Sequence, residues 1–379
     1  MSMNRRACIV VAVMIWVICS VLFAACHGEN SAKSHQEHAA DSMAVMPVTE
    51  CLVKTTPVKN LGASALCWVY AMLATIESEH LMQGDSVNLS PLFIGRMYLE
   101  EQAETYYLTQ GKRPVTQRGM ASTALHLLQR YGITHWDAFH GDVNLNVLAR
   151  KVEKTAHTCM ARRTGVARLR DHVSTLLDEH MHTAPQYVFM LGAEYTTREF
   201  AHSVCREHEY VALTSFTHHP FYQEFELQLP DNYYHDTFMN LPLDTLIHHI
   251  EHALRSGHPV CWEGDTSEPC YSFAQGIGKM ERDNVPVTQQ MRQQMFERFQ
   301  TTDDHCMEII GIARTPRGKK YFICKNSWGT GNALRGLVYL SENYLRAKTI
   351  AVWMSREAFA AGPTQNKSGF SSGFTEKKE

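Results

Sequence analysis

The chain has 379 residues and a formal net charge of -3 at pH 7, with 44% apolar and 20% charged residues. The composition is typical of a globular protein, and the length suffices for a large core or for two lobes in one unit. The nearly balanced charge excludes the strongly basic surface that nucleic-acid binding requires, so no nucleic-acid partner is expected.

A targeting segment is predicted over residues 1–25. Two arginines precede an almost uninterrupted apolar run over 7–25, and Cys26 follows it. Residues 22–26, Leu-Phe-Ala-Ala-Cys, resemble a bacterial lipoprotein signal in which Cys26 becomes the lipidated N-terminus. A secretory signal cut near Ala25 and an uncleaved anchor are the alternatives, since the run is close to the length of a spanning helix. All three predict export, and the first adds membrane attachment through the lipid on Cys26.

Polar segments flank the predicted folded domain. Residues 26–48 carry Ser, Gln, His, Glu and Asp with little periodicity, so we expect a flexible tether and no metal site at its histidines. Residues 359–379 are rich in Gly, Ser and Lys and predict a disordered tail. The folded domain is therefore expected over 49–358.

A helix is predicted from Trp68 to Met82, because apolar residues recur there at roughly helical spacing. Small residues and glycine in 57–66 allow a tight turn before it. Cys67 is therefore expected at or near a helix N-terminus, where free N–H groups and the helix dipole favour a thiolate. The thiolate is the form in which cysteine acts as a nucleophile.

Two further helices are predicted downstream, over 88–107 and 123–131. Ser90 supplies an N-cap for the first, and Pro91 fits its first helical position. Gly132 ends the second.

Later elements are predicted from the same signals. A charged and mostly helical segment covers 144–181, with one face formed by Val147, Leu148, Val152 and Ala156. The remaining elements are a helix over 244–255, a strand over 259–262, a helix in 281–300 that starts at Pro286, and a last helix and strand over 339–354.

Two polar residues lie far downstream of Cys67, at His305 and Asn326. Both lie at or beside short runs rich in isoleucine and phenylalanine, which are typical of strands. A cysteine nucleophile needs an imidazolium partner, and the imidazole needs an orienting group on its other nitrogen. The order of Cys67, His305 and Asn326 therefore predicts a catalytic triad.

These motifs resemble those of papain-like cysteine peptidases, and among them the bleomycin hydrolase and aminopeptidase C family. Residues 57–68 are similar to the segment around the nucleophile, and 326–329, Asn-Ser-Trp-Gly, to the asparagine motif. The subfamily is suggested by 215–222, 230–232, 262–268 and 301–305. The similarity covers about residues 51–355.

The resemblance implies an α+β papain-like fold, with a helical lobe, an antiparallel β-barrel-like lobe and large helical insertions. His305 follows Cys67 by 238 residues, against roughly 130–150 in papain-type enzymes, so about a hundred residues are expected to be inserted. Peptide substrates are implied, without a metal or organic cofactor. Gly119 is expected to border the substrate backbone, and Trp328 to shield the His–Asn hydrogen bond. A homo-oligomer, a hexamer in that family, is the implied assembly.

The sequence departs from the family pattern at two positions. Leu61 stands where the family has a glutamine whose amide donates to the oxyanion, and leucine cannot donate a hydrogen bond. Loss of one such donor typically costs about 10²–10³ in turnover. Arg118 replaces the first of two adjacent glycines in the substrate cleft, and Gly119 matches the second. Arg118 is therefore expected to narrow or charge that side of the cleft.

Eleven cysteines are present, and Cys67 must be free if it is the nucleophile. No Cys-x-x-Cys spacing indicates a zinc or redox site. Seven cysteines lie outside the signal, the lipidation site and the nucleophile, and we expect mostly buried thiols among them with at most one bridge: Cys51, Cys159, Cys205, Cys261, Cys270, Cys306 and Cys324. Neighbouring histidines at 218–219 and 248–252 are expected to bind no metal.

We therefore predict an exported cysteine-type peptidase, an aminopeptidase by resemblance. In that family the chain's own C-terminus reaches into the cleft and sets the aminopeptidase mode, whereas the tail here is longer. Leu61 motivates a second hypothesis, a peptide-binding protein on the same scaffold with weak or no catalysis. A third hypothesis keeps the triad but changes the reaction to acyl transfer or to hydrolysis of a non-peptide amide.

Overall fold

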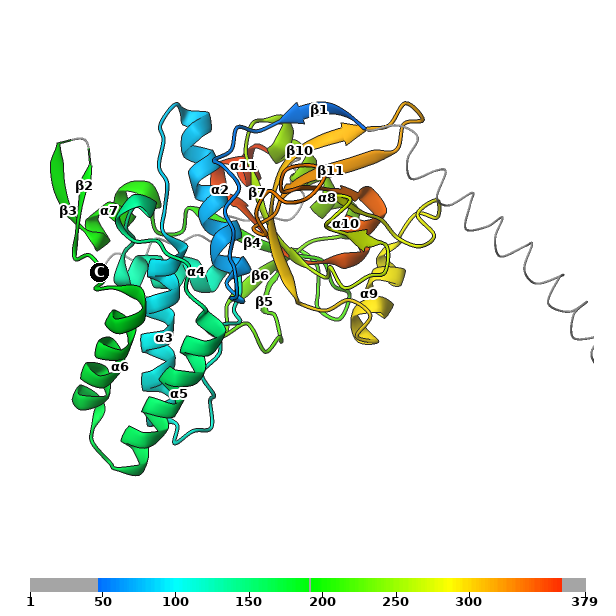
Figure 1. The fold of residues 1–379 in the computed structure, drawn as a ribbon. Helices are drawn as coiled ribbons and strands as arrows, with labels where there is room; N and C mark the ends of the chain where they lie inside the picture. Colours follow the sequence, from blue (N-terminus) through cyan, green and yellow to red (C-terminus); the bar gives the residue numbers. More distant parts are fainter. Residues whose placement is uncertain (1–46, 191, 363–379) are drawn as a thin grey trace, which may run out of the picture. The chain divides into compact units, whose positions relative to one another are not determined.

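The computed structural model describes residues 47–190 and 192–362 (Figure 1). The predicted signal, the lipidation site Cys26 and the tether up to residue 46 lie outside these residues. Of the described residues, 49–190, 192–314 and 319–362 form one compact unit, which holds the elements below.

Secondary structure extends slightly past the predicted domain bounds, 49–358, at both ends. Val48, which the sequence assigns to the tether, opens strand β1 (Val48–Leu52). Residues 359–361, assigned to the tail, complete helix α11 (Arg356–Ala361). The helix extends this far because Phe359 stacks on His249 with ring centroids 4.7 Å apart. The rest of the tail lies outside the described residues.

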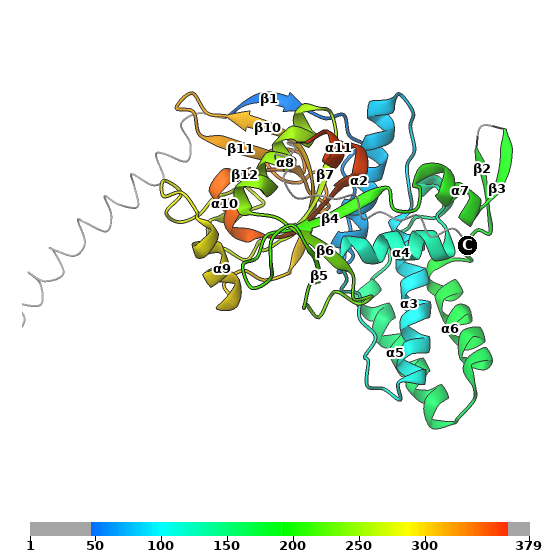
Figure 2. The same ribbon diagram turned by 180° about the vertical axis from the view of Figure 1, so that it is seen from behind.

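Helices dominate the first half of the unit, and α3, α5 and α6 pack side by side (Figures 1 and 2). Ser90 caps α3 by accepting from the Phe93 N–H, with proline at the first position, as predicted. The helices and the short hairpin of this half are α2 (Cys67–Gln83), α3 (Pro91–Leu108), α4 (Ala121–Tyr131), α5 (Leu145–Ala161), α6 (Val166–Met181), β2 (Tyr187–Met190), β3 (Ala193–Thr196) and α7 (Thr197–Val204), with a 3-10 turn at Trp136–Ala138.

A large mixed sheet, mostly antiparallel, forms the second half. Its strand order is β5-β6-β4-β13-β7-β10-β11-β12-β9-β8, and β1 pairs with β10. The strands are β4 (Tyr210–Thr214), β5 (Glu224–Glu226), β6 (Thr237–Asn240), β7 (Val260–Gly264), β8 (Tyr271–Ser272), β9 (Ile277–Gly278), β10 (His305–Arg314), β11 (Lys320–Lys325), β12 (Leu337–Ser341) and β13 (Thr349–Ser355). The accompanying helices are α8 (Leu243–Arg255), α9 (Gln289–Glu297) and α10 (Glu342–Lys348).

The sheet separates two cores, because successive side chains of a strand point to opposite faces. On β7, Cys261 joins the core cluster that contains α2, whereas Val260 and Trp262 join the cluster that contains α8. Both helices pack on β7 and β10. Helices α2 and α8 therefore cover opposite faces of the same two strands.

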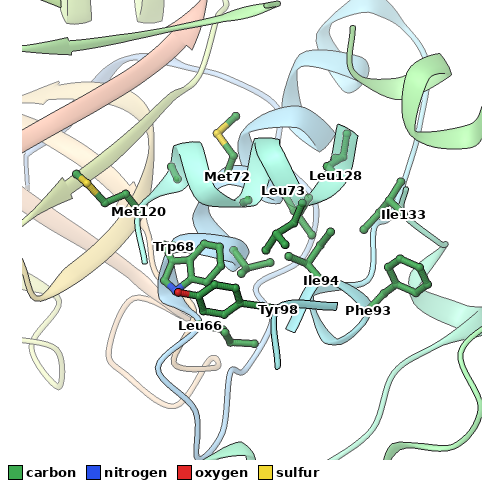
Figure 3. Close-up of a cluster of buried hydrophobic side chains, with 14 of the residues drawn as sticks. Leu66, Trp68, Met72, Leu73, Phe93, Ile94, Tyr98, Met120, Leu128 and Ile133 are labelled. Atoms are coloured by element: carbon green, nitrogen blue, oxygen red, sulfur yellow. The ribbon is translucent and has the colours of Figure 1, made fainter. Parts of the chain in front are cut away.

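Trp68 fixes the first turn of α2 in the helical core. Its ring meets Tyr98 edge to face, with centroids 5.3 Å apart, and Leu73 and Ile94 pack nearby (Figure 3). Each of these side chains is at least 98% buried. Because burial of one large apolar side chain contributes about 1.5–3 kcal/mol, this cluster holds the start of the helix firmly.

Two predicted details are wrong. Helix α9 begins at Gln289 after a Thr288 cap, so Pro286 precedes the helix instead of starting it. Val147 is 39% exposed, whereas Leu148, Val152 and Ala156 are buried as expected. The buried face of α5 is completed by Leu145 and Ala149 among others, at a spacing that turns Val147 outward.

No helix within residues 47–190 and 192–362 is both long enough and apolar enough to cross a membrane.

Candidate active site

Cys67 is the first residue of α2, as the sequence predicts. No side chain in the described part of the chain caps this helix N-terminus, so its first N–H groups are available to an anion. The preceding loop turns at Gly62, whose φ of +58° suits glycine. Leu61 N donates to Ser327 O at 2.8 Å, and Asn60 bridges to Trp328. These two backbone contacts bring Cys67 beside the segment that follows β11.

His305 opens β10 opposite Gly264 of β7. The register needs glycine there, because an added Cβ would lie 2.2 Å from Lys348 O and 2.4 Å from the Trp262 ring. Asn326 directly follows β11, which pairs antiparallel with β10. The antiparallel pairing thereby places His305 and Asn326, which are 21 positions apart, at the same end of these two strands.

Asn326 orients the His305 ring. His305 Nε2 lies 2.9 Å from Asn326 Oδ1, which also accepts from the Ser327 N–H at 2.7 Å. The Asn326 amide nitrogen lies 3.3 Å from the Tyr271 hydroxyl. Because Asn326 Oδ1 can only accept, His305 Nε2 carries a hydrogen and the other ring nitrogen, Nδ1, is left for Cys67.

Trp328 lies against the imidazole on the outer side. The two ring centroids are 4.5 Å apart, and Phe273 and Tyr271 support the indole edge to face. His305 and Asn326 are 4% and 2% exposed. This aromatic cover keeps water from competing for the His305–Asn326 hydrogen bond.

The thiol and the imidazole stabilise each other in charged form. A hydrogen bond from the Cys306 thiol, together with the hydrogen bond and charge of His305, holds the pKa of Cys67 well below its ordinary value despite burial. Burial alone would lower the pKa of His305, but its interactions with Cys67 and Asn326 raise it. Burial raises the pKa of Cys306, which stays a neutral donor. Both shifts favour the thiolate–imidazolium form of the pair.

A cleft of about 280 Å³ contains these groups. Leu61, Gly119 and Trp328 line it. Gly119 packs closely on Trp68, because a Cβ there would lie 3.1 Å from the indole ring and the ring would have to shift to admit it. Leu61 presents no donor to the cleft. Ser64 also lines it, and its hydroxyl donates to Leu61 O at 2.9 Å.

Four other residues line the cleft: Asp231, Asp303 and Asp304, which were not predicted as site residues, and Cys306, which was predicted to be a packing thiol. Asp303, Asp304 and Cys306 surround His305 in sequence, and Asp231 arrives from the loop before β6. Their position next to His305 was a signal for the first three, since neighbours of a strand-end residue share its surroundings. Asp231 lies within the 230–232 motif that suggests the subfamily, but nothing in that motif assigned it to the cleft.

The cysteines and histidines away from the cleft carry no further site. The cysteines within residues 47–190 and 192–362 are all free thiols, so the single bridge that the sequence allowed does not form among them. In the same ranges no three His, Cys, Asp or Glu side chains are placed to hold a metal ion. His218 instead lies 3.0 Å from the Gln293 amide and stacks on Phe296. Burial lowers the pKa of His249 to about 4, so it is neutral.

Comparisons with known proteins place the fold. No family model matches the chain, and no curated protein matches its sequence. Among solved structures, PepW from Lactobacillus rhamnosis HN001 superposes with a TM-score of 0.67 at 17% identity, over 84% of each chain. Bromelain from Ananas comosus matches with a TM-score of 0.38 at 14% identity, over 79% of this chain and 94% of that one. Procathepsin L2 from Tenebrio molitor matches with a TM-score of 0.43 at 14% identity, over 82% and 68%.

The chain thus has the fold of the papain-like cysteine peptidases, a helical half and a mainly antiparallel sheet half with added helices. At these identities the likeness establishes the fold, and the activity has to be argued from the site.

Proposed function

We propose that the protein is a thiol peptidase of the bleomycin hydrolase type that removes N-terminal residues from peptides. The observation that carries this proposal is the 2.9 Å contact between His305 Nε2 and Asn326 Oδ1, beside a cleft that His305 lines together with Cys67, whose thiol has a lowered pKa. A binding surface has no chemical need for a nucleophile, a proton carrier and an orienting amide in this order.

The proposed reaction proceeds through an acyl-enzyme. The Cys67 thiolate attacks the peptide carbonyl carbon, and the N–H groups at the start of α2 receive the developing oxyanion. His305 then gives its Nδ1 proton to the leaving amine as the C–N bond breaks. In the second half, His305 takes a proton from water, the hydroxyl attacks the thioester, and Cys67 leaves as the thiolate.

The test is hydrolysis of aminoacyl fluorogenic amides by the protein under reducing conditions. We expect turnover that disappears in Cys67→Ala and persists in the control Cys51→Ala, since Cys51 is a half-buried free thiol that does not line the cleft. Equal rates for the protein and Cys67→Ala, on free and blocked amino termini alike, would contradict the proposal.

Leu61 favours a second candidate function, a peptide-binding protein on this scaffold. Its side chain lines the cleft where an amide donor is expected. This candidate predicts that short peptides bind Cys67→Ala and the unmodified protein equally well, with no product formed by either.

Export and lipidation are part of the proposal. The apolar run over 7–25 and Cys26 support it. Cys26→Ser is expected to move the protein from the membrane fraction to the soluble fraction, whereas an uncleaved anchor would keep the variant in the membrane. The resemblance also motivates a homo-oligomer, which light scattering on the purified protein would detect.

A further inference from the structure

Arg118 spans the substrate cleft near the nucleophile. Its Nε donates to Asp231 Oδ2 at 2.7 Å, and its Nη2 donates to Asp303 O at 2.6 Å. Arg118, Asp231 and Asp303 all line the cleft that contains Cys67. Asp303 precedes His305 by two residues, so the guanidinium connects the segment around Gly119 to the wall that carries the imidazole.

Both ends of this bridge rest on fixed backbone. On one side, Trp68 Nε1 donates to Gln117 O at 2.9 Å, and the Tyr98 hydroxyl donates to Arg118 O at 2.8 Å. These bonds hold the segment against the helix that carries Cys67. A bridge from a fixed segment loses little conformational entropy when it forms.

At the Asp231 end of the bridge, the loop is held by hydrogen bonds of Asn232, which is 5% exposed. Its amide nitrogen donates to Leu227 O at 3.0 Å and to Asp236 O at 2.9 Å, and its oxygen accepts from the Asp236 N–H at 2.9 Å. The loop that presents Asp231 is therefore closed on itself. The guanidinium joins two rigid loops and does not rest on a mobile one.

The chemistry of the triad tells which end of a substrate meets this bridge. His305 protonates the leaving amine, so the leaving part of the peptide lies at the imidazole and Trp328. The acyl part must extend away from them, toward Gly119 and Arg118. The cleft of about 280 Å³ is also small, because pockets that bury a drug-sized ligand span about 300–1,000 Å³.

We propose that Arg118 sets how many residues a substrate can carry on the amino-terminal side of the scissile bond, by closing that end of the cleft through its ion pair with Asp231. This inference rests on the proposed peptidase function and deepens it. Charge adds a preference, since the Asp231, Asp303 and Asp304 residues also line the cleft. A free α-ammonium is favoured over a blocked amino terminus beside such a wall.

The experiment compares kcat/KM for three substrates that share one scissile bond: a free aminoacyl amide, its N-acetyl form, and a peptide extended by four residues at the amino end. We expect the protein to prefer the first. Arg118→Ala removes the bridge and should raise the ratio of extended to free substrate by on the order of tenfold or more. Asp231→Ala removes the acceptor at the other end of the bridge and should raise the ratio in the same direction.

Arg130→Ala is the matched control. The Arg130 side chain is 63% exposed and pairs with Glu101, against 57% for Arg118, but it does not line the cleft. Its ratio should stay that of the unmodified protein. An unchanged ratio in both bridge variants would overturn the inference while leaving the proposed function intact. Hydrolysis of the extended peptide as fast as the free amide would overturn the inference and the restriction to N-terminal residues, while leaving Cys67-dependent hydrolysis intact. Absence of any Cys67-dependent hydrolysis would overturn both.

A binding measurement gives a second readout that does not need turnover. In the inert Cys67→Ala background, calorimetry should show that Arg118→Ala tightens binding of the extended peptide by about tenfold relative to the short one. Equal gains for both peptides would mean that Arg118 only repels positive charge and does not limit length, which would contradict the proposal.

Discussion

Leu61 is the residue at which the site departs most from the chemistry it otherwise supports. Its N–H is bound to Ser327 O, so the backbone of the loop is in place, and its side chain lines the cleft. What is missing is one hydrogen-bond donor to the oxyanion. The N–H groups at the start of α2 remain, and the loss of one donor lowers turnover without abolishing it.

Leu61→Gln is therefore expected to accelerate the reaction. A restored amide would stabilise the transition state by roughly 3–4 kcal/mol, which corresponds to about 10²–10³ in kcat, with a smaller change in KM. Steady-state kinetics of the variant beside Leu61→Met, which keeps an apolar side chain of similar volume, provides the measurement. Turnover no faster than in Leu61→Met would favour the peptide-binding candidate.

The pH dependence is set by the thiolate and the imidazolium. The pKa of Cys67 is lowered and that of His305 raised, so activity should rise as Cys67 loses its proton and fall as His305 loses its own. Asn326→Ala removes one of the interactions that raise the pKa of His305, so the alkaline limb should move to lower pH. Because the ring also loses its orientation, kcat should fall on the order of 10²-fold.

The rate of Cys67 alkylation by iodoacetamide against pH checks the same shift without a substrate. Because alkylation needs only the thiolate, the loss of the His305 proton appears as a second step in the alkylation rate, and a step that stays at the same pH in Asn326→Ala would show that the amide oxygen does not stabilise the imidazolium.

At the residue scale, the sequence predicts candidate triad residues that carry a local signal. It misses residues that reach the cleft only through contacts between distant segments. Cys67, His305 and Asn326 each carry a local signal, namely a helix start or a strand end. Asp231 is 113 positions from Arg118, and nothing in either segment encodes their meeting. Arg118 was expected to charge the cleft, but its reach to Asp303 depends on how two distant loops fold.

Among the elements, helices with strong caps were predicted well. Helix α3 begins after Ser90, whose side chain accepts a hydrogen bond from a free N–H group of the first turn. Helix α4 ends at Gly132, where a glycine allows the chain to leave the helix. The start of α9 was wrong because Thr288, three residues before the Met291 N–H, competes with the proline signal and provides the actual cap. Strands β8 and β9 have two residues each, which is too short for a periodic signal.

Helix α2 is tied to the start of β7 by a charged pair that should make stability depend on pH. His258 Nδ1 lies 3.0 Å from Glu79 Oε2, and this hydrogen bond raises the pKa of His258 above its ordinary 6.5. A raised folded-state pKa means that the contribution is complete below pH 6.5 and is lost as pH rises through the folded value.

His258→Gln should therefore lower the free energy of unfolding by about 1–2 kcal/mol at pH 5.5 and by less at pH 9. Urea unfolding at the two pH values measures this difference, with exposed His202→Gln as the control. An equal loss at both pH values would assign the effect to packing and not to charge.

At the scale of the whole molecule, the class of the fold follows from the sequence, but the order of the strands does not. Strand β13, for example, lies between β4 and β7 and pairs with both, although both are far from it in the sequence. The division of β7 between two cores is equally invisible along the chain, since its residues are buried on both faces and show no alternation. Such strands can be placed only when their partners are known.

A buried ion network connects the nucleophile's loop to both halves of the unit. Glu77 of α2 contacts Lys59 Nζ at 2.5 Å and accepts from the Leu89 N–H at 2.7 Å. The Thr56 hydroxyl donates a hydrogen bond to Glu77 and accepts one from Lys325 Nζ of β11. Lys325 Nζ also forms an ion pair with Glu308 of β10 at 3.2 Å. The network therefore holds the approach to Cys67 against α2 and against the strands that carry His305 and Asn326.

Glu77→Gln should destabilise the protein by about 3–5 kcal/mol, because it leaves the Lys59 charge buried without its partner. Burial already lowers the pKa of Lys59 against the pull of Glu77, so the cation depends on this carboxylate. Adding Lys59→Met should recover most of the loss, since the amide of Gln at 77 still accepts from Leu89 and no unpaired charge remains. Chemical denaturation of the two single variants and the double variant forms the cycle. A double variant no more stable than Glu77→Gln would show that the network acts through packing, and that charge does not join the two halves.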